Sequence, residues 1–175
     1  TIQLISTTID EVAYSNDWEV KFGSEEGIEN LALGVNWIAV YTDLNNFYIY
    51  SLSGILKSIF TVSYHAICMA GYENLLVYVY HLGPPLLGSQ SLGFKILDSN
   101  RNFETIYEGP LPITPFSYLS WIGFSEEGML FSYDSEKVLR HFSFNLGKNW
   151  IPMLNISTIY NNCPNTNFWV VGVQD

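Results

Sequence analysis

The sequence is poor in charge and in cysteine, and each shortage argues against a class of function. Charged residues make up 14% of the 175 positions, and the seven lysines and arginines are scattered singly among seventeen acids. Phosphate binding needs clustered basic side chains, so we do not expect a direct nucleic-acid surface. The two cysteines, Cys68 and Cys163, make a poor disulfide framework and favour a reducing compartment, with Cys68 in the core.

Long apolar runs are missing as well. The longest, Leu75 to Leu87, contains His81 and a Gly-Pro-Pro sequence and is too short to cross a bilayer. The sequence therefore does not predict membrane insertion.

The usual signatures of catalysis are absent. The sequence has no dinucleotide-binding Gly-x-Gly-x-x-Gly, no phosphate-binding Gly-Lys-Ser/Thr loop and no Gly-x-Ser-x-Gly nucleophile motif. His65, His81 and His141 have no second ligand at metal-binding spacing. We therefore expect no cofactor, no metal site and no enzymatic activity.

Two pairs of acids are the strongest counter-evidence, because two carboxylates between aromatic walls cleave glycosidic bonds. Glu25-Glu26 and Glu126-Glu127 both occur in the phrase Ser-Glu-Glu-Gly. Adjacent strand residues point to opposite faces, so neither pair alone is a catalytic pair. Recurrence at an equivalent position favours a structural hairpin motif, and a carbohydrate-active protein that uses Glu126 stays as an alternative.

What the sequence does contain is a repeat of short strands. Successive units begin at Glu29, Ala66, Leu119 and Phe168, with an average spacing of about 46 residues. Each complete unit gives four strand-like segments separated by turn residues. This period is typical of β-propeller blades. We predict an all-β fold of four-stranded antiparallel blades, in which the chain covers about three blades and edge strands of a larger ring.

The repeat suggests a division of the chain into five parts. We expect strands that close or flank the ring over 1–28, a first blade over 29–65, a second over 66–117 and a third over 118–155, followed by a linker and the first strand of another blade over 156–175.

The second unit is longer than the others because of an insertion between its second and third strands. Gly83-Pro84-Pro85 and Gly88 interrupt strand pairing, so we predict a projecting loop over 82–92. Exposed apolar side chains on a loop need an explanation. The candidate partner-binding residues are therefore Pro84, Pro85, Leu86 and Leu87, unless they fold back over their own blade.

Three tryptophans begin predicted inner strands, where large rings wedge between blades. Trp37, Trp121 and Trp169 are therefore the predicted structural core. Stacking on a sugar or a peptide is the alternative for these rings.

Several phrases, in a fixed order, resemble one family. They are Trp18-Glu19-Val20, ENLALG at 29–34, WIAV at 37–40, LSWIGFSEEG at 119–128 and WVVGV at 169–173. The chain resembles the middle, second-propeller region of the minichromosome-loss and chromosome-transmission-fidelity replisome adaptors, called acidic nucleoplasmic DNA-binding proteins in animals. The resemblance runs from about residue 18 to residue 173.

The resemblance implies a nuclear scaffold. Members of this family carry a six-bladed second propeller followed by a helical bundle, and together these form a homotrimer that ties DNA polymerase alpha to the replicative helicase. Peptides from the polymerase and from the GINS part of the helicase dock mostly on regions outside this chain. A generic peptide-binding propeller without a replication link remains a second interpretation.

Overall fold

The computed structural model describes residues 2–4, 18–86, 89–159 and 170, and the chain in these ranges is mostly β-strand. The first of three sheets contains β3 (Ile28–Leu33), β4 (Trp37–Thr42), β5 (Asn46–Ser51) and β6 (Leu56–Thr61). The second contains β7 (Ala66–Tyr72), β8 (Leu75–Leu86), β9 (Ser89–Asp98) and β10 (Glu104–Pro110). The third contains β11 (Leu119–Phe124), β12 (Leu130–Asp134), β13 (Val138–Ser143) and β14 (Asn149–Asn155). The remaining elements are β1 (Ile2–Leu4), β2 (Trp18–Val20), the 3-10 turn η1 (Ser99–Arg101) and the single helical turn α1 (Ile156–Ile159).

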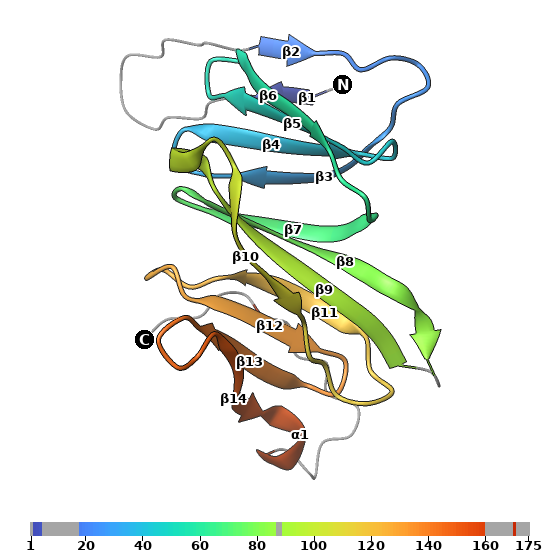
Figure 1. Ribbon diagram of the computed structural model, residues 1–175, viewed down its shortest axis with the longest axis vertical. Coiled ribbons are helices and arrows are strands. Elements are labelled where there is room, and N and C mark those ends of the chain that lie inside the picture. Colours follow the sequence, from blue (N-terminus) through green and yellow to red (C-terminus); the bar gives the residue numbers. More distant parts are fainter. Residues whose placement is uncertain (1, 5–17, 87–88, 160–169, 171–175) are drawn as a thin grey trace.

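Each four-stranded sheet is an antiparallel meander whose strands pair in chain order. The sheets succeed one another along the long axis of the molecule, and the first strands β3, β7 and β11 are neighbours (Figure 1). β1 and β2 pair with each other beside the first sheet. Sheets that pack through their faces with their first strands adjacent are propeller blades. The predicted all-β fold of four-stranded blades is confirmed.

Side-chain alternation divides each central strand between two neighbouring interfaces. In β8, Leu76, Tyr78 and Tyr80 belong to the buried cluster shared with the first sheet, whereas Val77 and Val79 belong to the cluster shared with the third. All five side chains are at most 3% exposed. A strand that is buried on both faces reads as a continuous apolar run, which explains the sequence LLVYVY.

Two hairpins are closed by the same five-residue turn, Ser51–Ile55 after β5 and Ser125–Met129 after β11. In each, the serine N–H donates to the carbonyl of the fifth residue at 2.8 Å, and the glycine N–H donates to the serine carbonyl at 3.0 Å. The serine Oγ accepts from the fifth N–H at 3.1 and 3.2 Å. Gly54 and Gly128 have φ near +80°, a left-handed conformation that glycine adopts without steric cost.

Both of these turns lie at the same end of the blades, and the two ends are named here for what they carry. The hairpin rim is the end that carries the turns after the first and third strand of each sheet. The crossover rim is the opposite end, which carries the turns after β4 and β12 and the connections between sheets.

The predicted loop over 82–92 is wrong, because β8 and β9 continue through it as a hairpin. Gly83 pairs with Ser91 and Leu86 pairs with Ser89, with register shifts on both sides of Gly83. These irregularities take up the prolines, which cannot donate to a ladder. The extension, here called the arm (81–86 and 89–92), lies beyond the last residues of β8 and β9 that pair with β7 and β10. Its outer edges carry no further strand, so proline is tolerated there.

The predicted core tryptophans occupy different environments. Trp37 is 1% exposed and packs between the first and second sheets. Trp121 is only partly buried and belongs to none of the buried clusters of the described residues, which corrects its expected place in the core. Its neighbour Ile122 takes the buried position facing the second sheet, while the Trp121 ring lies over Gly123 of its own strand. Trp169 lies outside the described residues.

Candidate interaction surfaces

The two Ser-Glu-Glu-Gly phrases lie at opposite ends of the blades. The N–H of Gly27 donates to Asp43 Oδ1 at 3.0 Å, which places the first phrase on the crossover rim. The second phrase forms the Ser125–Met129 turn on the hairpin rim. The predicted equivalence of the two phrases is wrong, since the first phrase precedes β3 and the second follows β11. The turn that shares the geometry of Ser125–Met129 is Ser51–Ile55. Carboxylates at opposite rims cannot act on one glycosidic bond.

The first phrase has a structural role through Glu26. Its carboxylate accepts hydrogen bonds from Thr42 Oγ1 at 2.7 Å, from the Tyr48 hydroxyl at 3.0 Å and from Asn46 Nδ2 at 3.2 Å. The bond from Thr42, together with those from Asn46 and Tyr48, lowers the pKa of Glu26 in spite of partial desolvation. Glu26 thereby fastens the segment before β3 to the first sheet.

A second polar cluster ties the connection between the second and third sheets to the third sheet. Asp134 is fully buried, and its carboxylate accepts from Arg140 Nη1 at 2.6 Å and from the Thr114 hydroxyl at 2.7 Å. The backbone N–H groups of Thr114 and Val138 complete its partners. Burial alone would raise the pKa of Asp134, but these hydrogen bonds outweigh burial and lower it. The cluster fixes the connection between β10 and β11 against the β12–β13 hairpin.

Neither cluster resembles a catalytic or metal centre. Among the described residues, no group of three or more His, Cys, Asp or Glu side chains could hold a metal ion. Burial raises the pKa of the Cys68 thiol to about 12, which keeps it protonated and unreactive near neutral pH. Cys163 lies outside the described residues. In the described part of the chain, no helix has the length and hydrophobicity needed to cross a membrane.

The arm carries the sequence-predicted partner residues that the structure describes. Pro84 and Pro85 are exposed, as is Leu82 at 45%. Leu86 ends β8, and Leu87 lies outside the described residues. The arm is attached to the following connection, because the N–H of Phe116 donates to Ser89 Oγ at 3.0 Å and that of Leu119 to Gln90 Oε1 at 3.1 Å. The arm therefore remains a candidate partner surface.

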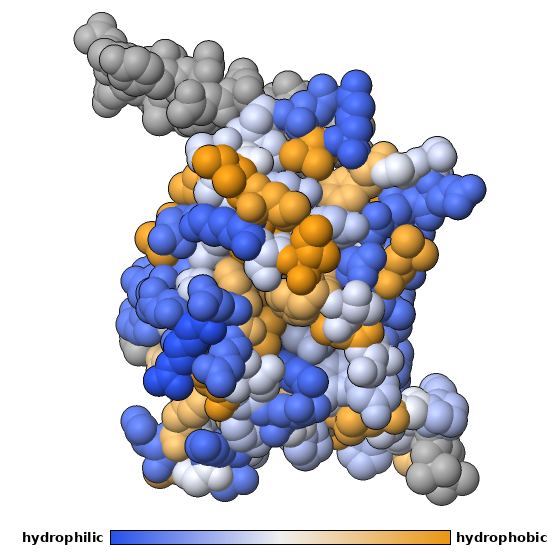
Figure 2. All heavy atoms as spheres, turned by 45° about the horizontal axis from the view of Figure 1, so that its top comes forward, coloured by the Kyte–Doolittle hydropathy of each residue, from blue (hydrophilic) through white to orange (hydrophobic). Residues whose placement is uncertain are grey.

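Apolar side chains are also exposed on the first sheet. In Figure 2 they gather on the upper part of the face turned to the viewer, with polar residues around them. Leu31 and Leu33 on β3 and Leu56 and Ile59 on β6 are 44% to 57% exposed. The innermost and the outermost strand of this sheet thus both present apolar surface.

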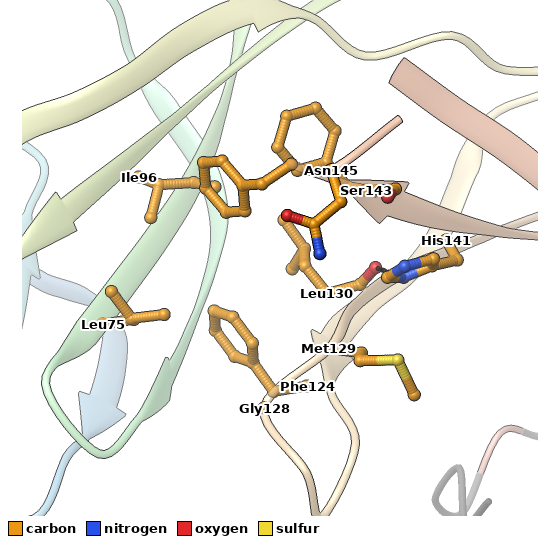
Figure 3. Close-up of a pocket in the computed structure, with 11 residues that line it drawn as sticks. Leu75, Ile96, Phe124, Gly128, Met129, Leu130, His141, Ser143 and Asn145 are labelled. Atoms are coloured by element: carbon orange, nitrogen blue, oxygen red, sulfur yellow. Dashed lines mark hydrogen bonds between the residues drawn. The ribbon is translucent and has the colours of Figure 1, made fainter. Parts of the chain in front are cut away.

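A third candidate is a cleft of about 200 Å³ between the second and third sheets at the hairpin rim, here called the rim cleft. Leu75, Ile96, Phe124 and Leu130 converge on a common space, with the Asn145 amide at one side of it (Figure 3). The remaining lining residues are Gly128, Met129, His141, Phe142, Ser143 and Phe144. The rim cleft is lined mostly by apolar groups and opens beside two turns, β11–β12 and β13–β14.

The rim cleft was not predicted from the sequence. Its residues are scattered over five strands and two turns, and the apolar ones on the strands each look like core residues in the sequence. The one local signal was the Ser-Glu-Glu-Gly phrase, whose Gly128 lies in the lining. That phrase predicted a turn, but it did not predict the cleft that lies beside the turn.

The fold defines the class of the protein as a β-propeller. A solved structure of HIRA residues 644–1017 has the same fold, with a TM-score of 0.54 and 14% sequence identity over 78% of this chain and 42% of that one. At this identity the likeness concerns the fold alone.

The chain belongs to the family described as "Minichromosome loss protein, Mcl1, middle region", whose model matches residues 2–175. It is similar to WD repeat and HMG-box DNA-binding protein 1 of mouse (35% identity) and human (34%), over 92% of this chain and 14% of each relative. It is also 35% identical to the Arabidopsis thaliana protein ENHANCER OF LHP1 1, over 93% of this chain and 17% of that protein. The resemblance drawn from the sequence phrases is confirmed. The chain spans less than a fifth of the length of these relatives.

Proposed function

We propose that the chain is the propeller part of a non-enzymatic replisome scaffold in the nucleus. In this proposal the complete protein is a homotrimeric adaptor with a six-bladed second propeller, and it links DNA polymerase alpha to the GINS part of the replicative helicase. The observation that carries the proposal is membership of the Mcl1 middle-region family over nearly the whole chain. The words "DNA-binding" in the names of the animal relatives support a nuclear, chromatin-associated location.

The physical character of the blades suits a scaffold. Their large side chains are buried against one another, and the rims and the arm are left to vary without loss of the core. A trimer would present several identical client sites, which raises the effective concentration of bound partners. The surface of this chain that we expect to contact a partner is the arm around Pro84 and Pro85.

The test is capture of replication proteins by the complete protein. Light scattering should give a trimer, and pull-down should retain DNA polymerase alpha and GINS. The variant Pro84→Glu/Pro85→Glu should lose part of this capture if the arm contributes to it. A matched control is Ile55→Glu, which adds a carboxylate at a 66% exposed position on the opposite rim. A monomer that retains neither partner would contradict the proposal.

A peptide-binding propeller without a replication link is the second candidate, and the rim cleft favours it. The proteins that co-purify with the complete chain discriminate between the two. If the proteins that co-purify with the chain include no replication protein, this second function is favoured over the first.

A further inference from the structure

The rim cleft has the size and lining of a side-chain pocket. Its volume of about 200 Å³ exceeds the ~150 Å³ of an engineered protein cavity that binds benzene. One leucine, methionine or phenylalanine side chain would therefore fill it. Phe144 at the mouth is 43% exposed, so apolar surface continues from the cleft to solvent.

A polar group inside the rim cleft suits a polypeptide. The Asn145 amide lies at the side of the common space in Figure 3, and the residue is exposed, so the amide is accessible from solvent. A carboxamide offers both a donor and an acceptor, which matches the N–H and C=O of one peptide unit. Asn145 can therefore hold a peptide backbone while a neighbouring side chain of that peptide enters the cleft.

The charges around the mouth are acidic. Glu73 lies in the β7–β8 turn, two residues before the lining residue Leu75, and Glu127 directly precedes the lining residue Gly128. Both glutamates are exposed. Desolvation, followed by the negative charges of Glu73 and Glu127, raises the pKa of the Tyr72 hydroxyl. The Tyr72 hydroxyl donates to the Glu126 carbonyl at 2.7 Å and so joins the two turns beside the cleft. The nearby base Lys148 lies over the Tyr107 ring, with 5.8 Å from Nζ to its centroid.

We propose that the rim cleft binds a short extended peptide with one large apolar side chain flanked by lysine or arginine. The apolar side chain enters the space between Leu75, Phe124 and Leu130. Asn145 bonds the peptide backbone, and Glu73 and Glu127 attract the flanking bases. This inference rests on the proposed scaffold role, because the rim cleft would be one of the scaffold's client sites. The inference does not depend on which client protein binds.

The test is a direct titration with defined peptides. Fluorescein-labelled Gly-Lys-Arg-Leu-Ser-Lys-Gly is titrated against the full chain and followed by fluorescence anisotropy. The controls are the same peptide with glycine in place of leucine, and with glutamate in place of the three bases. We expect saturable binding of the first peptide and at least a tenfold loss, about 1.4 kcal/mol, for each control.

Two variants place the binding on the rim cleft. Asn145→Ala and Glu127→Lys should each weaken binding by about three- to tenfold, and the second effect should shrink at high salt. The matched control is Glu136→Lys, which reverses an exposed charge on the same sheet at the crossover rim. It should bind like the parent chain. Near-identical circular dichroism and melting temperature show that the variants fold.

Three outcomes would overturn the inference. The first is no saturable binding up to millimolar peptide, and the second is equal binding of the charge-reversed peptide. The third is a change in oligomeric state in Asn145→Ala without peptide, since the rim cleft would then hold a second copy of the chain. Capture of replication proteins by the complete protein could persist in all three cases, so failure here is distinguishable from failure of the scaffold proposal.

Discussion

The two interfaces between the sheets differ in how their large side chains are anchored. Between the first and second sheets, the Trp37 indole donates to the Glu73 carbonyl at 2.9 Å, and the Tyr41 hydroxyl accepts from the N–H of Ala66 at 2.9 Å. Between the second and third sheets, the buried rings are Phe94 and Phe142, and the partly buried Trp150 packs against them with its indole nitrogen buried and without a partner among the described residues. The first interface is anchored by hydrogen bonds made by its fully buried rings. At the second interface the fully buried rings are apolar, and the hydrogen bonds come from partly buried tyrosines at the hairpin rim, from Tyr72 to the Glu126 carbonyl at 2.7 Å and from Tyr107 to the Lys148 carbonyl at 3.4 Å.

The difference continues to the hairpin rim. The first interface ends there in a hollow of about 330 Å³ lined mainly by polar side chains, including Asn36, Lys57 and Asn100. The second ends in the smaller and mostly apolar rim cleft, with Glu127 beside it. The hairpin rim therefore presents polar side chains and the base Lys57 at the first interface, and apolar surface beside an acid at the second. This contrast shows that blade repetition fixes the location of a pocket but not its chemistry.

The largest expected effect breaks the first interface. Trp37→Ala should lower the free energy of unfolding by about 3 to 5 kcal/mol, because it removes a fully buried ring and one of the two donors to the Glu73 carbonyl, which keeps the N–H of Val35 at 2.8 Å. Trp121→Ala is the matched comparison and should cost about 1 to 2 kcal/mol, because its ring is only partly buried. Urea denaturation of both variants measures the difference. Equal costs would mean that the two rings contribute alike and that the contrast in burial has no energetic consequence.

The two tryptophans also show what could be predicted from sequence. Strand existence and blade period were readable because apolar runs and turn residues are local signals. Which face of β11 meets the second sheet depends on the position of the neighbouring blade. The local sequence therefore did not indicate that Ile122, rather than Trp121, would be the buried residue. The arm was missed for a related reason. Prolines interrupt an internal strand but are tolerated in a hairpin whose outer edges are unpaired. The edges of the arm are unpaired because β7 and β10 end before it, and the lengths of these two strands could not be predicted from the arm's own sequence.

A smaller effect tests the Asp134 cluster, which holds the connection between the second and third sheets. Asp134→Asn should cost about 2 to 3 kcal/mol at neutral pH, because it removes a fully buried carboxylate that binds Arg140. The pKa of Asp134 is lowered in the folded chain, so its contribution is complete above the unfolded-state value of about 3.9 and is lost as pH falls through the folded value. Denaturation between pH 7 and pH 3 should show parent and variant converging at the acid end. A constant difference over this range would contradict the assignment.

The double variant Asp134→Asn/Arg140→Met sharpens this result. Removing both partners takes away the uncompensated guanidinium, whose side chain is 13% exposed, and should recover part of the loss. No recovery would indicate that the hydrogen bonds to Thr114 and Val138, rather than the ion pair, carry the stabilisation.

The smallest expected effect concerns single hydroxyls at the two interfaces. Tyr80→Phe removes a hydrogen bond to Glu108 Oε1 of 2.7 Å and should cost about 0.5 to 1 kcal/mol, because Glu108 is half exposed and keeps Lys95 at 3.2 Å. That hydrogen bond, followed by the interactions with Lys95, lowers the pKa of Glu108. The cost should therefore be complete above the unfolded-state value of about 4.3 and vanish as pH falls through the folded value. Tyr72→Phe should change the unfolding free energy by less than Tyr80→Phe, since its acceptor is a turn carbonyl at the hairpin rim that water can reach. A larger effect for Tyr72→Phe would mean that the hydrogen bond from Tyr72 to the Glu126 carbonyl stabilises the second interface more than a bond at the hairpin rim is expected to.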